Sequence, residues 1–196
     1  IDAQSHAFVA RYLPSAGPLR FISAVLRTGI ALERVGDYAV TICREAVQLS
    51  DEPPPDIARD VETMAHHARQ LLNQATRAFH EGNAELARGT MGFADQFGSS
   101  FPRLFDDLVQ EAEAGARPVR DLFALLVVLN RLERTCDQSK NICEDTLFAV
   151  TGEVKAPKVY KVLFLDEHNT RKSLLAEAMA RKAYPESCSY ASAGWT

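Results

Sequence analysis

The strongest constraint in this sequence is an internal repeat, because the chain matches itself when it is shifted by 100 residues. Between positions 20–43 and 120–143, nine of 24 residues are identical without a gap. In both copies, apolar residues recur at steps of three and four, which is typical of one face of a long helix. We therefore interpret the chain as two copies of one helical unit.

Turn residues divide the chain into elements. Helices are predicted over 2–13, 19–50, 56–79, 84–114 and 120–150. The run Pro53-Pro54-Pro55 separates the two copies because no helix can cross it. The Gly- and Pro-containing stretch 98–102 should bend the helix of 84–114. Long antiparallel helices with short turns predict a mainly α structure, a helical bundle.

The two copies differ in extent. Repeat two, residues 56–153, has three helices, whereas repeat one, residues 1–50, has only the end of a middle helix and a last helix. We therefore expect an N-terminally truncated first repeat within a helical domain of residues 1–153. The composition changes after this domain: a β-rich run at 159–165, a helix at 171–183 and a second strand at 187–192 predict a β-α-β fragment in a partial domain of residues 158–196.

Composition excludes several classes of protein. Residues 1–157 carry 16 Lys and Arg against 22 Asp and Glu, and this acidic body argues against nucleic-acid binding. No apolar run approaches the roughly 18 residues that a membrane span needs. The four cysteines form no C-x-x-C pair, so they indicate reduced thiols and a cytoplasmic location rather than a disulfide scaffold.

The repeated segment Leu-Glu-Arg-x-x-Asp places two carboxylates on one helix face, and each copy has such a pair. The four residues are Glu33, Asp37, Glu133 and Asp137. Like charges at this spacing destabilise a helix by a few tenths of a kcal/mol, so we expect a cation nearby. Either Arg34 and Arg134, or an arginine from a neighbouring helix, neutralise the pairs, or a hard metal ion lies between carboxylates of facing helices. Spacing alone leaves both interpretations open.

These residues resemble the PhoU family of regulators of phosphate uptake. The family pattern Leu-Glu-Arg-x-x-Asp-x-x-x-Asn-Ile is matched fully by residues 132–142, and residues 32–42 match it except for Thr41. The resemblance covers about residues 1–153. It implies two three-helix bundles and a non-enzymatic role, with a phosphate ABC transporter or a sensor histidine kinase at the membrane face as partner. A homo-oligomer is a further expectation.

The same resemblance implies metal sites formed by E-x-x-x-D on the last helix and D-x-x-x-D on the middle helix of each copy. The ligands that it implies are Glu33, Asp37, Glu133, Asp137, Asn141, Asp2 and Asp95. In the second copy Ser99 stands where the pattern has its second Asp, which is a departure from the family. The expected cofactors are metal ions: iron, zinc, manganese, magnesium or calcium.

The segment 162–178 resembles the start of low-molecular-weight tyrosine phosphatases and thioredoxin-coupled arsenate reductases. These enzymes hold an oxyanion in a Cys-x5-Arg loop at a helix N-terminus. Here Asp166 replaces the cysteine and Lys172 replaces the arginine, so the resemblance implies a degenerate anion loop of Asp166, Asn169, Lys172 and Ser173. A carboxylate would repel phosphate, and lysine lacks the arginine fork.

We therefore expect a PhoU-like regulator of phosphate transport and signalling that acts by protein–protein contact and is not an enzyme. Two alternatives remain. One is a phosphatase or arsenate reductase with a helical regulatory domain, which Asp166 disfavours. The other is a helical scaffold without metal, which metal analysis would distinguish.

Overall fold

The computed structural model describes residues 1–97, 100–115, 117–154 and 159–195, and it describes side chains in these ranges except at 95–97 and 100–102. The chain divides into two compact units, a helical unit of residues 1–154 and a second unit of residues 155–196. Each unit is described separately below.

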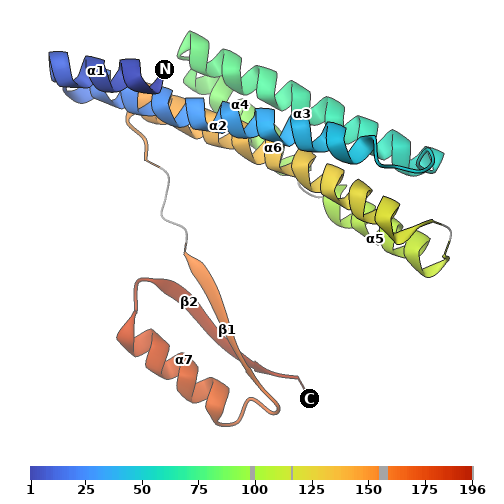
Figure 1. The fold of residues 1–196 in the computed structure, drawn as a ribbon. Coiled ribbons are helices and arrows are strands. Elements are labelled where there is room, and N and C mark those ends of the chain that lie inside the picture. Colours follow the sequence, from blue (N-terminus) through green and yellow to red (C-terminus); the bar gives the residue numbers. More distant parts are fainter. Residues whose placement is uncertain (98–99, 116, 155–158, 196) are drawn as a thin grey trace. The chain divides into compact units, whose positions relative to one another are not determined.

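The helical unit consists of six helices in its described residues, and it confirms the expected mainly α class. They are α1 (Asp2–Tyr12), α2 (Ala16–Ala46), α3 (Pro55–Glu81), α4 (Ala84–Phe97), α5 (Ser100–Glu113) and α6 (Val119–Thr151), as Figure 1 shows. The helix expected over 84–114 is two helices, α4 and α5. Pro102 lies in the first turn of α5, where its missing N–H removes no helical hydrogen bond.

The bounds of α2 differ from the prediction at both ends. It begins at Ala16, before Pro18, because a proline is tolerated in the first turn of a helix. It ends at Ala46 and not at Ser50. The backbone N–H and the hydroxyl of Ser50 instead donate hydrogen bonds to the carboxylate of Asp121 at the start of α6. The segment between α2 and α3 is thereby attached to α6.

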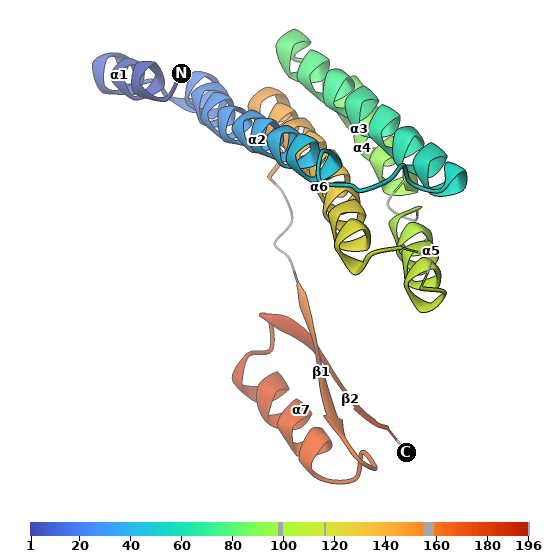
Figure 2. The same ribbon diagram turned by 45° about the vertical axis from the view of Figure 1, so that its right-hand side comes forward.

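Helix α6 is the centre of the unit, since α2, α3, α4 and α5 all pack against it (Figures 1 and 2). Each of the three hydrophobic clusters includes residues of α6, among them the fully buried Leu129 and Ile142. The face of α3 that contributes Ala68, Leu71 and Ala75 is buried in the same core. Burial of these apolar side chains provides the main stabilisation of the unit.

The repeated helices α2 and α6 differ in burial at equivalent positions. Leu32 is 41% exposed whereas Leu132 is 7% exposed, and Cys43 is exposed whereas Cys143 is fully buried. The cause is the packing around each helix. Helices α3, α4 and α5 cover α6, whereas the main described contacts of α2 are with α6 and the short α1.

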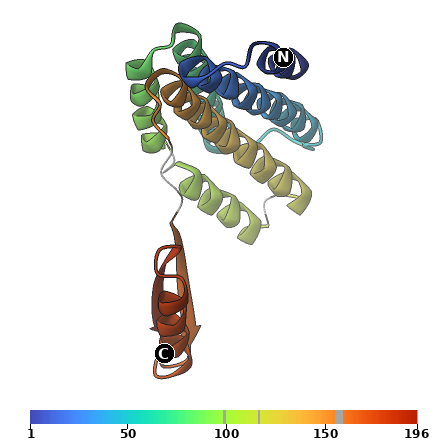
Figure 3. The same ribbon diagram turned by 90° about the vertical axis from the view of Figure 1, so that its left-hand side faces the viewer.

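The second unit is a β-α-β arrangement of β1 (Tyr160–Asp166), α7 (Lys172–Ala183) and β2 (Cys188–Gly194) (Figure 3). The two strands are parallel, and their register runs from Tyr160 opposite Cys188 to Asp166 opposite Gly194. Helix α7 packs on both strands. The predicted order of elements in this segment is confirmed.

A search of the described helices finds none with an apolar stretch long enough to cross a membrane.

Candidate functional site

The two E-x-x-x-D pairs lie at the same level of the α2–α6 pair. The helices are antiparallel: Arg27 of α2 contacts Asp145 of α6 at 2.5 Å, and the Arg131 guanidinium lies 5.6 Å from the ring centroid of Tyr38. This register places Glu33 level with Asp137 and Asp37 level with Glu133, to within about one turn. An approximate two-fold relation between the repeats therefore relates the two carboxylate pairs.

The environments of the two pairs are unequal. Glu33, Asp37 and Asp137 are exposed, whereas Glu133 is half-buried. Burial raises the pKa of the Glu133 carboxyl, the Asp137 carboxylate raises this pKa further, and the Arg134 guanidinium lowers it. Glu133 is therefore the acidic group of this set whose ionised form is least stabilised, so a nearby cation would stabilise it.

The first expected source of positive charge is the arginine of each motif, Arg34 or Arg134. Within the described residues, no ion pair joins Arg34 or Arg134 to the four carboxylates. A search of the same residues for three or more His, Cys, Asp or Glu side chains grouped around a common point finds none. Each pair by itself offers two carboxylates, so any ion there would need further oxygen ligands.

The other residues predicted as metal ligands are found in separate places. The Asp2 carboxylate lies 3.4 Å from His6 Nδ1 in α1 and is exposed. The Asn141 side-chain amide donates a hydrogen bond to Gln138 Oε1 at 3.5 Å. The side chain of Asp95 lies outside the described residues, and so does that of Ser99.

Two cysteine thiols of α6, those of Cys136 and Cys143, have raised pKa values. Burial, together with the Asp137 and Glu133 carboxylates, raises the pKa of the Cys136 thiol to about 11. Burial likewise raises the pKa of the Cys143 thiol to about 12. Without a bound cation, both thiols are therefore protonated at neutral pH. The proximity of Cys136 follows from its position three residues after Glu133, although the sequence analysis did not single it out.

In the second unit, three of the four predicted anion-loop residues come together. The Asp166 carboxylate accepts hydrogen bonds from the backbone N–H groups of Asn169 and Ser173, the latter at 3.0 Å. The Ser173 hydroxyl donates to Asn169 Oδ1 at 2.7 Å. The Ser173 hydrogen bonds, with those from Asn169 and His168, lower the pKa of Asp166 to about 2. Lys172 is exposed, and it makes no hydrogen bond or ion pair among the described residues.

The Asp166 carboxylate thus lies where an oxyanion would bind, at the N-terminus of α7. The backbone N–H groups of Asn169 and Ser173 therefore donate to the loop's own carboxylate, that of Asp166. The side chain at this position is a carboxylate, so the loop offers no thiolate there.

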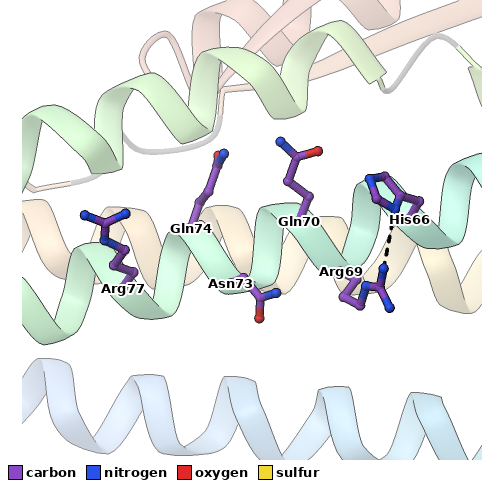
Figure 4. A pocket seen from close by; sticks show the side chains of 6 residues that line it. All are labelled: His66, Arg69, Gln70, Asn73, Gln74 and Arg77. Carbon is purple, nitrogen blue, oxygen red and sulfur yellow. Dashed lines mark hydrogen bonds between the residues drawn. The ribbon is translucent and has the colours of Figure 1, made fainter.

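A polar groove on α3, with a volume of about 320 Å³, was not predicted from the sequence. It is lined by His66, Arg69, Gln70, Asn73, Gln74 and Arg77, which Figure 4 shows as sticks. A usable signal was present, since residues 63–80 contain no Asp or Glu.

Fold and carboxylate pattern together place the helical unit in a class, that of all-helical repeat proteins with paired acidic motifs on their longest helices. Comparison with known proteins shows similarity to one family. The PhoU domain model matches residues 61–146. The matched segment lies within the helical unit.

Relatives extend the similarity over most of the chain. A "Phosphate-specific transport system accessory protein PhoU homolog" of Clostridium acetobutylicum is 29% identical over 138 residues, which are 70% of this chain and 63% of that protein. A PhoU homolog of Methanothermobacter thermautotrophicus is 28% identical over 154 residues, 78% of this chain and 70% of that protein. The chain thus spans less than two thirds of the Clostridium relative. The names describe these relatives as accessory proteins of phosphate-specific transport systems.

Solved structures agree with the fold. The crystal structure of PhoU from Pseudomonas aeruginosa aligns with a TM-score of 0.73 and 26% identity, over 78% of this chain and 73% of that chain. The PhoU regulatory protein of Streptococcus pneumoniae aligns with a TM-score of 0.70 and 22% identity, over 79% and 72%.

Proposed function

We propose that this protein regulates phosphate transport by protein–protein contact and performs no catalysis. The observation that carries the proposal is the PhoU domain in a helical unit whose named relatives are accessory proteins of phosphate transport systems. The phosphate ABC transporter and the sensor histidine kinase are the proposed partners.

The proposed activity is tested by phosphate uptake in bacteria that lack their own PhoU. Expression of this chain should restore regulated uptake of radiolabelled phosphate when phosphate is in excess. Uptake that stays as unregulated as in cells carrying an empty vector, with the chain present at normal levels and folded, would contradict the proposal.

The Glu133–Asp137 pair is the proposed centre of a metal site on α6, and Glu33–Asp37 is its counterpart on α2. The raised pKa of Glu133 supports a cation here, because a bound cation would offset both the burial and the Asp137 charge. Carboxylate oxygens suit magnesium, calcium, manganese or iron, and they also ligate zinc. When bound, such an ion would supply positive charge and order to this face of the helix pair.

Metal analysis of the purified protein separates this proposal from a metal-free scaffold. The variant Glu133→Ala/Asp137→Ala should lose bound metal, whereas Cys43→Ala/Cys143→Ala should retain it. The matched control is Asp107→Ala/Glu111→Ala, which removes a pair of the same spacing from α5. Equal metal content in all variants, or loss of metal only in the cysteine variant, would contradict the assignment.

Phosphatase or reductase activity is the weaker alternative for the second unit. The position and low pKa of Asp166 support its exclusion, since the carboxylate occupies the donors that would hold a substrate oxyanion. Hydrolysis of an aryl phosphate that is abolished by Asp166→Ala would contradict this view.

A further inference from the structure

An apolar groove lies between α5 and the first turns of α6, on the surface of the helical unit. All of the side chains that line it are apolar, yet Phe105 is 42% exposed and Phe123 is 63% exposed. Since a phenylalanine side chain has roughly 200 Å² of surface, these two rings together leave about 200 Å² of apolar surface in water. The exposed Val109 and Val119 enlarge the patch to a size that is often functional on soluble proteins.

The floor of the groove is firm, because it is formed by the core of the unit. Leu108 and Leu122 line it and are buried in the hydrophobic cluster that α5 and α6 share with α3. The volume is about 180 Å³. Sites for small molecules usually enclose about 300–1,000 Å³. The groove is therefore better suited to a bulky apolar side chain of a partner, such as the anchors with which an amphipathic helix binds in a groove.

The α5 rim of the groove is acidic. Asp106 precedes Val109 by three residues and Glu113 follows it by four, so both lie about 40–60° to the same side of Val109. Both carboxylates are exposed, and within the part of the chain that the structure describes no ion pair involves either one. Arg120 lies on α6, at one end of the groove, so the acidic row belongs to α5 alone. This row can therefore pair with cations from a partner.

We propose that this groove binds a basic amphipathic helix of a partner protein. The apolar side chains of that helix enter between Phe105 and Phe123, and its Lys or Arg side chains pair with Asp106 and Glu113. Apolar contact supplies the affinity, whereas the acidic row selects the charge and the orientation of the helix. The inference rests on the proposed regulation by protein–protein contact, and it assigns a surface and a partner chemistry to that contact.

The charges favour this occupant over two others. An anionic membrane surface attracts basic segments and would be repelled by the acidic row of α5. A second copy of the chain offers an excess of the same charge, since residues 1–157 contain 16 Lys and Arg against 22 Asp and Glu. A basic helix meets neither objection.

The test measures binding of two synthetic helical peptides to the full chain by fluorescence anisotropy. Both peptides have leucine at positions i, i+3, i+4 and i+7, and their polar positions are lysine in one and glutamate in the other. The lysine peptide should bind at least about tenfold more tightly at low salt. Val109→Ser/Phe123→Ser should weaken its binding about tenfold or more. The matched control Phe8→Ser/Val40→Ser changes two exposed residues outside the groove and should bind like the wild type.

Charge reversal tests the acidic row separately from the apolar contact. Asp106→Lys/Glu113→Lys should transfer the preference to the glutamate peptide. The control Glu62→Lys/Glu85→Lys makes the same change in net charge at exposed positions of α3 and α4, and it should retain the preference for lysine. Circular dichroism verifies that the helices are retained in each variant.

Several outcomes would overturn the proposal. They are an absence of binding by both peptides, equal binding by the wild type and Val109→Ser/Phe123→Ser, and a wild type that does not prefer the lysine peptide. Binding to phosphatidylglycerol vesicles that this double variant abolishes would assign the groove to a membrane surface instead. A dimer that the variant dissociates, as measured by light scattering, would assign it to a second copy. None of these results would alter the phosphate uptake experiment, which tests regulation independently of the groove.

Discussion

Replacement of Asp121 tests how the segment that joins the two repeats is held. Its carboxylate is 1% exposed and lies in the first turn of α6. It accepts hydrogen bonds from the backbone N–H of Ser50 at 3.2 Å and from the Ser50 hydroxyl at 2.5 Å. The largely buried Arg117 guanidinium lies 3.7 Å away and also donates to the carbonyl oxygens of Asp51 and Glu52.

The cost of Asp121→Ala follows from these partners. Hydrogen bonds to a charged group contribute about 1.5–3 kcal/mol each. In the variant, the exposed Ser50 can form hydrogen bonds to water instead, which reduces the cost. The largely buried Arg117 guanidinium loses its nearby carboxylate, which increases the cost. We expect a loss of about 3 kcal/mol in the free energy of unfolding. Asp121→Asn retains an acceptor of the same shape and should lose about half as much.

Urea denaturation followed by circular dichroism at 222 nm measures this loss. The control Asp106→Ala removes an exposed carboxylate from α5 and should change the free energy by less than about 0.5 kcal/mol. A double-mutant cycle of Ser50→Ala with Asp121→Ala should give a coupling energy of about 1–2 kcal/mol. Additive effects in that cycle would refute the view that these two residues hold the segment together.

Two further predictions concern single side chains. Asp166→Asn should destabilise the second unit, which contains the single tryptophan, Trp195, and tryptophan fluorescence during unfolding measures the effect. Folding lowers the pKa of Asp166 from 3.8 to about 2, so the ionised carboxylate contributes its full stabilisation of the second unit above the unfolded pKa. This stabilisation is lost as the pH falls from about 4 to 2. A difference in stability between wild type and variant that does not shrink over that pH range would contradict the assignment. A thiol reagent should label the exposed Cys43 quickly, whereas the buried Cys143, whose pKa is about 12, should be labelled only on unfolding. Mass spectrometry of the labelled peptides measures the two rates. Equal labelling rates would count against the described packing of α6.

The repeat and the helical periodicity predicted the long helices to within a few residues, because apolar side chains at three- and four-residue steps reflect burial directly. They could not predict which copy is covered. Leu32 and Leu132 are identical residues in matching positions, yet only Leu132 is buried, because α3, α4 and α5 pack against α6. Burial of this kind depends on neighbours that are distant in the sequence.

The candidate sites were predictable to different degrees. The acidic pairs on α2 and α6 follow from four-residue spacing, whereas their common level depends on the antiparallel register of the two helices, which contacts such as Arg27–Asp145 fix. The groove on α3 was missed because exposed arginines and amides also occur on ordinary solvated helix faces. What distinguishes it is the absence of carboxylates between Glu62 and Glu81.

The carboxylate of Asp166 has a consequence for competition in the α7 loop. It is tethered next to the donors that it occupies, so its effective concentration there is of millimolar order or higher. A free oxyanion must exceed that local concentration, or bind more tightly, before it displaces the side chain. The loop therefore stays insensitive to small changes in the surrounding phosphate concentration.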